Sequence, residues 1–272
     1  MKKGAHSVAG VAVRKGREQP VTRALPEEVP VALVYNGSTQ AVMMATPDDL
    51  HDFAVGFSLS EGIITDPVQI TRFEIVKHGQ GLEAQMWLSE DRAEFLAARR
   101  RFMAGPVGCG LCGIDSLAQA LRHVPSVISD LALDAADIPA AMSALRAAQP
   151  LHDQTRAVHA AGFYVAGQGI VVAREDVGRH NALDKVIGAM ARAGMSGTVG
   201  AIALTSRVSV EMVQKCAAAG SPVLIAVSAP TVLAVQTAQD AGITIAALAR
   251  DEAFEIFTHS ARIKTGATHH VA

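Results

Sequence analysis

Two cysteines that stand close together are the side chains of this sequence best suited to covalent chemistry. Cys109 and Cys112 lie within residues 104–113, a stretch that also holds four glycines and a proline. Thiols at this spacing can bind a metal, exchange a disulfide or carry sulfur as a persulfide. Because glycine and proline interrupt regular structure, the sequence predicts that both thiols sit on a mobile loop.

Metal binding is the least favoured of these three functions. A structural zinc site needs four ligands, and beyond the motif the chain offers only Cys216 and 10 scattered histidines. A zinc-dependent nucleobase deaminase would need His-x-Glu upstream of Pro-Cys-x-x-Cys, but no histidine here precedes a glutamate by two residues and Gly108 replaces the proline. We expect no bound metal. We expect Cys216, in an alanine-rich helical stretch, to be a buried core residue.

Sulfur carriage and thiol-disulfide exchange both remain open. A thioredoxin-like pair normally lies between a strand and the start of a helix, whereas the nearest helix expected here begins only after Gly113. A flexible loop suits a persulfide carrier, because it can visit a donor and an acceptor in turn. The cations at residues 99–101 favour the thiolate form. Two cysteines without a chemical role are a third interpretation.

The sequence before residue 151 divides into an N-terminal tail and a first domain. Residues 1–27 are polar and aperiodic and predict an N-terminal tail. Residues 28–150 predict an α+β domain that carries the cysteine loop, with a hairpin about Asn36-Gly37 and a helix that begins at Thr46. Two further strands and a charged helix follow, and the last helices of this domain are expected over residues 115–123 and 138–148.

Residues 151–272 predict a second, different domain. Strands and helices alternate with short connections, and the strands are nearly uninterrupted apolar runs. Such strands are typical of a largely parallel sheet with helices on both faces. We therefore predict an α/β protein with an N-terminal α+β domain and a C-terminal three-layer α/β/α domain.

Polar side chains follow three strands of the predicted C-terminal sheet. In chain order they are Arg179 and His180, Ser206 and Arg207, and residues 228–231. Ligands of open α/β sheets bind at the carboxyl ends of the strands, and helix N-termini there accept phosphate. These residues predict a site for an anionic, phosphate-bearing ligand. The alternative is that residues 174–185 form a solvated loop whose acids cap the next helix.

Composition narrows the choice of partners and compartment. The net charge is −2 and only 4% of residues are aromatic, so we expect no nucleic-acid partner. An odd number of cysteines, three in all, favours a reducing compartment. The N-terminus lacks the apolar core of a signal peptide and no long uncharged apolar run is present. We therefore expect a cytoplasmic protein that does not associate with membranes.

Five motifs together resemble one known family. They are residues 56–64, residues 108–113 (Gly-Cys-Gly-Leu-Cys-Gly), residues 175–185 (which begin Glu-Asp-Val-Gly-Arg-His and end at Lys185), residues 206–215 and residues 228–235. The family that they resemble is the FdhD family, which comprises accessory sulfurtransferases of formate dehydrogenase. The resemblance spans roughly residues 28–260.

This resemblance implies a function for the cysteines. Members of the FdhD family receive sulfur from a cysteine desulfurase as a persulfide. They pass it to the molybdenum cofactor, Mo-bis(molybdopterin guanine dinucleotide), before formate dehydrogenase takes up that cofactor. Cys109 would then carry the persulfide, and Cys112 would relay or help to release the sulfur. A thiol-disulfide oxidoreductase and a cofactor chaperone without sulfur chemistry are the alternatives.

The resemblance also implies a fold and a binding site. The C-terminal domain would have a cytidine-deaminase-like fold without its zinc, and the protein would be a homodimer. The guanine nucleotide of the cofactor would bind that domain, where the family's cofactor stretch corresponds to Leu248, Ala249, Arg250, Asp251, Glu252 and Ala253. This sequence departs from the usual pattern of the family at two places. Asp251 and Glu252 stand where a glycine is usual, and Thr155-Arg-Ala-Val-His159 stands where many members have Thr-Gly-Gly-x-His.

Overall fold

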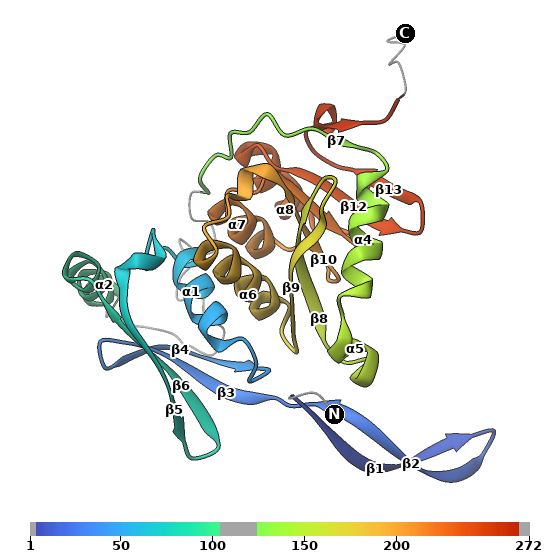
Figure 1. Ribbon diagram of the computed structural model, residues 1–272, viewed down its shortest axis with the longest axis horizontal. Helices are drawn as coiled ribbons and strands as arrows, with labels where there is room; N and C mark the ends of the chain where they lie inside the picture. The colour runs from blue at the N-terminus through green and yellow to red at the C-terminus, as the bar shows by residue number, and fades with distance from the viewer. Residues whose placement is uncertain (1–3, 104–123, 267–272) are drawn as a thin grey trace.

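The computed structural model describes residues 4–103 and 124–266 (Figure 1). A small sheet with two helices lies beside a larger sheet that has helices on both faces, and a two-stranded hairpin projects from the molecule. The cysteine motif and the helix expected over residues 115–123 lie outside the described residues.

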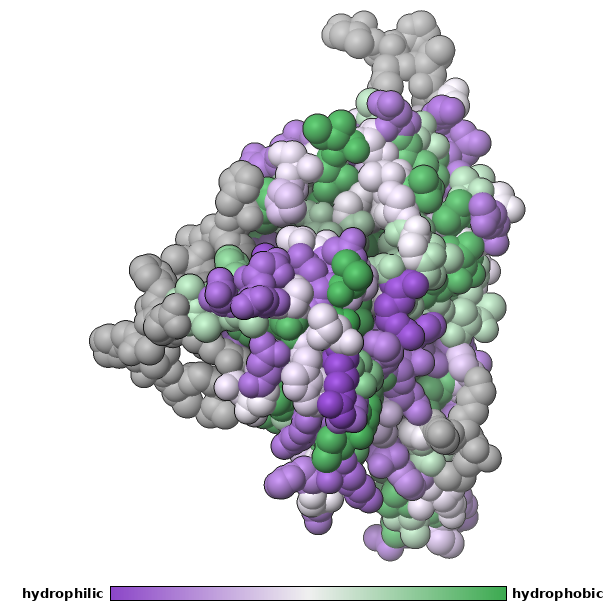
Figure 2. Space-filling view, turned by 60° about the vertical axis from the view of Figure 1, so that its left-hand side comes forward, coloured by the Kyte–Doolittle hydropathy of each residue, from purple (hydrophilic) through white to green (hydrophobic). Residues whose placement is uncertain are grey.

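The small sheet has the strand order β4-β3-β6-β5: β3 (Val29–Tyr35), β4 (Ser38–Ala45), β5 (Ile70–His78) and β6 (Gly81–Leu88). The predicted hairpin about Asn36-Gly37 is confirmed, and both residues adopt the left-handed conformation of a tight hairpin turn. Helices α1 (Leu50–Ser60) and α2 (Glu90–Met103) accompany the sheet, and a core centred on Phe53 joins them to it. Hydrophilic and hydrophobic residues are interspersed over the face of the molecule drawn in Figure 2.

Helix α1 begins at Leu50, later than the start predicted at Thr46. Thr46 is fully buried, and its polar groups bond across the molecule instead of capping the helix. Its amide donates to Asp176 Oδ2 at 3.0 Å, and its carbonyl accepts from Lys185 Nζ at 3.0 Å. The threonine is thus committed to a tertiary contact that the local sequence pattern does not show.

The N-terminal residues form a hairpin, so the polar tail predicted for residues 1–27 is wrong. Strands β1 (Ala5–Arg14) and β2 (Arg17–Pro26) pair antiparallel around Lys15-Gly16, which are both left-handed. The turn lacks the asparagine or aspartate that usually marks such a turn in a sequence. That missing signal explains why the two strands are not recognisable from their residues.

The large sheet has the order β13-β12-β11-β10-β8-β9: β8 (His159–Val165), β9 (Gly169–Asp176), β10 (Ala201–Leu204), β11 (Val223–Ala226), β12 (Thr244–Arg250) and β13 (Ala253–Ile256). Neighbouring strands pair parallel only at β10–β11 and β11–β12 and antiparallel elsewhere in this sheet, so the sheet is mixed rather than largely parallel. Their side chains alternate between two separate cores, one on each face.

Helices cover both faces of this sheet, as predicted (Figure 1). One face carries α6 (Arg179–Arg192), α7 (Val210–Ala218) and α8 (Val232–Ala241). The other carries α4 (Asp137–Ala147), although the sequence analysis assigns this helix to the N-terminal domain. The boundary expected near residue 150 therefore separates α4 from the sheet that it covers.

The remaining elements are short. They are α5 (Pro150–Thr155), the parallel pair β7 (Leu133–Asp134) and β14 (Ile263–Lys264), and 3-10 turns at Pro67–Gln69, Gly197–Val199 and Ser260–Arg262. No helix within the described ranges combines the length and the apolar character needed to cross a membrane.

Candidate functional site

The candidate site is one edge of the large sheet, where the parallel strands β10, β11 and β12 have their carboxyl ends. The start of β8 and the end of β9 reach the same edge, because β8 runs antiparallel to both β10 and β9. The structure thus brings the polar residues predicted at separate strand ends to one place. We call them the carboxyl edge: His159, Arg179, His180, Ser206, Arg207 and residues 248–253.

Two arginines of the carboxyl edge form no ion pair with the residues that the structure describes, although the Glu211 carboxylate is near enough to Arg179 for their charges to interact. Arg179 opens α6 and is partly exposed, and Arg207 follows β10 and is exposed. Neither guanidinium makes a hydrogen bond or an ion pair with any residue that the structure describes. Arg250, at the end of β12, has one weak contact, in which its Nε donates to the Val227 carbonyl oxygen at 3.3 Å. Unpaired guanidinium groups at a strand edge favour an anionic ligand.

His180 is held by a carboxylate that the sequence analysis does not single out as a site residue. Its Nε2 lies 2.7 Å from Oε2 of Glu211, in the first turn of α7, and the Ser209 hydroxyl donates to the same oxygen at 3.3 Å. The hydrogen bond with His180 is the main reason that the pKa of Glu211 is lowered. The ionised carboxylate therefore fixes the orientation of the imidazole.

His159 differs from His180 in its surroundings. Burial lowers the pKa of His159, and the positive charges of Arg179 and His180 lower it further. The neutral imidazole is thus the favoured form of His159.

Residues 248–253 leave regular strand geometry at the place where the family's cofactor stretch is expected. The β12–β13 register shifts between Ala247 and Arg250, and both Leu248 and Asp251 have a φ of 54°. A left-handed Asp251 explains why a glycine is usual there, because aspartate is one of the few other residues that tolerate this conformation. For Leu248 the same conformation costs about 1–3 kcal/mol, and such strain concentrates at functional sites.

Most of residues 174–185 are neither ligands nor a solvated loop. Asp176 and Lys185 are fully buried and form an ion pair of 2.7 Å, and Asn181 donates to the same aspartate at 2.9 Å. Glu175 accepts from the first backbone amides of α5, so it caps a helix other than the one that follows it. Only Arg179 and His180 of this motif contribute to the carboxyl edge.

A second set of buried charges joins α1 to α6 and α7. Lys215 Nζ lies 2.9 Å from Asp184 Oδ1 and donates to the Ser60 hydroxyl, also at 2.9 Å. Burial raises the pKa of Asp184, while Lys215 acts in the opposite direction. We call this contact region, together with the Asp176–Lys185 pair, the α1–α6 interface.

Two glycines allow the helices of this interface to touch. A Cβ on Gly56 would fall 1.7 Å from the Asp184 carbonyl oxygen, and one on Gly188 would fall 1.9 Å from the Asp52 carbonyl oxygen. Asp52 also forms ion pairs with Arg174, at 2.7 Å, and with Arg192. The interface thus fixes the small sheet and its helices against the large sheet and its helices.

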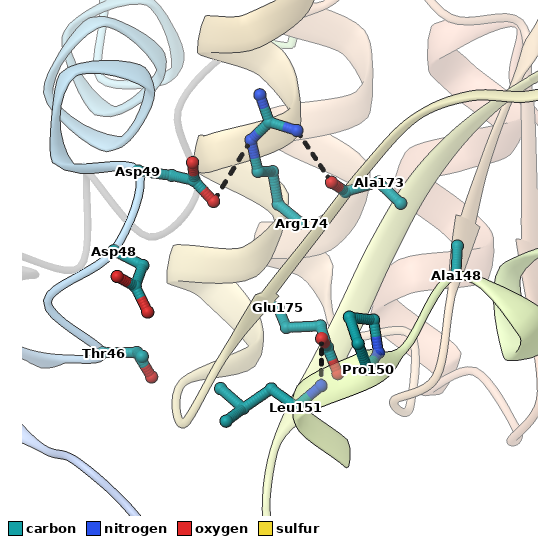
Figure 3. A pocket seen from close by; sticks show the side chains of 9 residues that line it. All are labelled: Thr46, Asp48, Asp49, Ala148, Pro150, Leu151, Ala173, Arg174 and Glu175. Atoms are coloured by element: carbon teal, nitrogen blue, oxygen red, sulfur yellow. Dashed lines mark hydrogen bonds and ion pairs between the residues drawn. The ribbon is translucent and has the colours of Figure 1, made fainter. Parts of the chain in front are cut away.

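A cavity of about 480 Å³ opens between the loop before α1 and the β9–α5 region (Figure 3). Its lining polar groups are already engaged: Arg174 contacts Asp49 and the Ala173 carbonyl oxygen, and Glu175 accepts from Leu151. None of the carboxyl-edge residues lines this cavity.

The structure describes one of the three cysteines, Cys216. Cys109 and Cys112 lie outside the described residues, so their roles stay predictions. Cys216 is fully buried in α7, which confirms its expected place in the core. Burial raises its pKa to about 12, so this thiol is not available as a thiolate. Within the described residues, no group of three His, Cys, Asp or Glu side chains could hold a metal ion.

Comparison with known proteins identifies the family of this chain. The model of the FdhD/NarQ family matches residues 26–264. The chain belongs to the FdhD/NarQ family. It is 58% identical to the sulfur carrier protein FdhD of Agrobacterium fabrum, over 94% of this chain and 95% of the relative, and 53% identical to FdhD of Brucella abortus, over 90% and 91%.

A solved structure supports the same relationship. The crystal structure of a protein from Desulfotalea psychrophila, described as a formate dehydrogenase accessory protein, superposes with a TM-score of 0.75 at 28% identity. The match covers 96% of this chain and 99% of that one. The residues matched by the FdhD/NarQ model include the cysteine motif and the carboxyl edge but leave out almost the whole β1–β2 hairpin.

Proposed function

We propose that this FdhD/NarQ-family protein carries sulfur as a persulfide on Cys109 to Mo-bis(molybdopterin guanine dinucleotide), and that the sulfurated cofactor then enters formate dehydrogenase. A cysteine desulfurase supplies the sulfur, and the molybdenum cofactor is the substrate. Family membership and the names of the relatives, sulfur carrier proteins, support sulfur carriage. The main support for placing the cofactor site at the carboxyl edge is that the guanidinium groups of Arg179 and Arg207 form no ion pair with the described residues.

Loading is a transfer of one sulfur atom between cysteines. The Cys109 thiolate attacks the terminal sulfur of the desulfurase persulfide, the sulfur–sulfur bond of the donor breaks, and the donor cysteine leaves as a thiolate. Cys109 thereby becomes a persulfide, and the transfer needs no external oxidant or reductant. A low pKa of the attacking thiol helps, because only the thiolate is nucleophilic.

Release uses the second cysteine of the motif. The Cys112 thiolate attacks Sγ of Cys109, the bond to the terminal sulfur breaks, and that sulfur leaves as sulfide toward the molybdenum of the cofactor. The product is a Cys109–Cys112 disulfide, which a dithiol reductant returns to two thiols. Cys112 therefore matters for release and for turnover rather than for loading.

The carboxyl edge holds the guanine nucleotide part of the cofactor. Arg179, Arg207 and Arg250 are the cations available to phosphate oxygens, and the Glu211–His180 pair adds an oriented imidazole. The exposed carboxylates of Asp251 and Glu252 would repel phosphate, so they face the guanine base, whose N–H groups donate to carboxylate oxygens. The cofactor is bound in a homodimer that acts in the cytoplasm.

Mass spectrometry after incubation with a cysteine desulfurase and cysteine tests the proposal. The wild type and Cys112→Ala are expected to gain an adduct of about 32 Da that reductant removes, and Cys109→Ala is expected to gain none. An adduct that persists in Cys109→Ala would overturn the assignment of the carrier thiol. No adduct on the wild type with an active desulfurase would overturn persulfide carriage and favour a cofactor chaperone.

A further inference from the structure

The first turn of helix α8 exposes two large apolar side chains. Val232 is 76% exposed and Leu233 is 42% exposed, and neither belongs to a hydrophobic core among the described residues. Farther along the helix, Ala234 and Ala238 are buried against the large sheet. Isolated apolar side chains are common on protein surfaces, whereas a group of them rimmed by polar residues marks a binding surface. We call Val232 and Leu233 the apolar patch.

Backbone hydrogen bonds place the apolar patch beside a cation of the carboxyl edge. The segment after β10 and the segment after β11 run parallel where Val208 pairs with Pro230. The Val208 amide donates to the Ala229 carbonyl oxygen at 3.3 Å, and the Thr231 amide donates to the Val208 carbonyl oxygen at 3.0 Å. Arg207 directly precedes Val208 in the chain, and the apolar patch directly follows Thr231. The exposed Arg207 and the apolar patch therefore lie on neighbouring segments.

The end of β12 reaches the same part of the carboxyl edge. Strands β11 and β12 are parallel neighbours, and α8 connects them, so the start of α8 lies at their carboxyl ends. The Nε of Arg250 donates to the carbonyl oxygen of Val227, in the segment that leads into α8, at 3.3 Å. Asp251 and Glu252 follow and are exposed. Cations, carboxylates and the apolar patch thus meet at one place.

We infer that Val232 and Leu233 form the surface on which the flat face of the guanine base lies. The inference rests on the proposed function, which places a guanine nucleotide at the carboxyl edge. A purine has apolar faces and hydrogen-bonding edges, so a site that holds it needs an apolar contact for a face and polar groups for an edge. The apolar patch supplies that contact within reach of Arg207 and Arg250, the cations available to the phosphates of the same nucleotide.

A protein partner fits the apolar patch less well than a base does. A stable protein interface buries about 800 Å² of each partner, which is more than two side chains provide. The centre of such an interface is also poor in charged residues. Here exposed charges surround the patch, namely Arg207, Arg250, Asp251 and Glu252. A small apolar surface with charged neighbours of both signs matches a purine nucleotide instead.

Calorimetric titration with two ligands tests the inference. GDP carries the base and the phosphates, whereas inorganic pyrophosphate carries the phosphates alone. Val232→Ser/Leu233→Ser is expected to bind GDP about tenfold more weakly than the wild type, because the apolar contact is lost, and to bind pyrophosphate like the wild type. Val68 lies in the turn Pro67–Gln69 and is 78% exposed, so Val68→Ser is the matched control and is expected to bind both ligands like the wild type.

The outcomes separate the apolar patch from the nucleotide site as a whole. Wild-type affinity for GDP in the double serine variant would overturn the inference while leaving the nucleotide site in place. An equal loss of affinity for GDP and for pyrophosphate would also overturn it, because the patch would then support the site rather than contact the base. A wild type that binds neither ligand would refute the nucleotide site of the proposed function together with the inference.

Methyl NMR of the wild-type protein provides a second readout that does not depend on a variant. The ring current of a bound purine shifts the resonances of methyl groups that lie against its face, and pyrophosphate has no ring. GDP is therefore expected to move the methyl resonances of Val232 and Leu233 upfield, and pyrophosphate is expected to leave them in place. The methyl resonances of Val68 should not move with either ligand. Saturation with GDP without an upfield shift at the apolar patch would overturn the inference.

Discussion

The α1–α6 interface and the carboxyl edge use neighbouring residues of one charged motif in opposite ways. In the interface, Asp176 and Lys185 are fully buried and neutralise each other. At the edge, Arg179 belongs to the same motif but has no partner among the described residues. The difference divides the charges of this motif into two groups: the paired ones fix two parts of the fold together, and Arg179 is the one that we propose binds a ligand.

Removal of Lys185 is expected to have the largest effect on stability. Lys185→Ala leaves Asp176 buried without its counter-charge and lowers the free energy of unfolding by about 3–5 kcal/mol. Denaturant titration measures the change. The exposed Lys77 on β5 provides the control, because Lys77→Ala is expected to change stability by less than about 0.5 kcal/mol. Equal effects at the two lysines would show that the interface is not a buried ionic contact.

A methyl group between the helices is expected to have a smaller but clear effect. Gly56→Ala places a Cβ against the backbone of Asp184, so α1 and α6 must separate, at a cost of about 1–3 kcal/mol. Gly10→Ala is the matched control, because a Cβ at Gly10 meets only a Val21 methyl, at 3.9 Å. Thermal unfolding compares the two variants. If Gly56→Ala unfolds at the same temperature as the wild type, close contact of α1 with α6 does not stabilise the association of the small sheet with the large sheet.

The Glu211–His180 pair is expected to contribute least to stability, by less than about 1 kcal/mol, because both side chains are partly exposed. The pKa of Glu211 is lower in the folded protein, so its contribution is present above the unfolded pKa and is lost as the pH falls through the folded pKa. Glu211→Gln should therefore be slightly less stable than the wild type at neutral pH and equal to it in acid. A difference that grows in acid would contradict the assigned hydrogen bond.

Local patterns are enough to predict much of the fold. The Asn36-Gly37 hairpin, the alternating strands and helices after residue 158, and the core position of Cys216 follow from turn chemistry and hydrophobic periodicity. The β1–β2 hairpin could not be predicted in this way, because Lys15-Gly16 is a weak turn signal. The place of α4 could not be predicted either, since any apolar helix face can cover either sheet.

Charge spacing alone is a poor guide to the site. The sequence marks residues 174–185 as charged and close to a strand end, but it does not show which charges are buried. Burial of Asp176 and Lys185 depends on Thr46, more than a hundred residues away in the chain. Glu211 likewise becomes a site residue only when the fold brings the starts of α6 and α7 together.

Calorimetric titration with GDP tests most directly whether the unpaired charges form the nucleotide site. The double variant Arg179→Ala/Arg207→Ala is expected to bind GDP at least about tenfold more weakly than the wild type, because each charge-assisted hydrogen bond contributes about 1.5–3 kcal/mol, with no change in its unfolding transition. Arg146→Ala, which removes a cation already paired with Asp153, should bind like the wild type. Wild-type affinity in the double variant would contradict the assignment of the carboxyl edge.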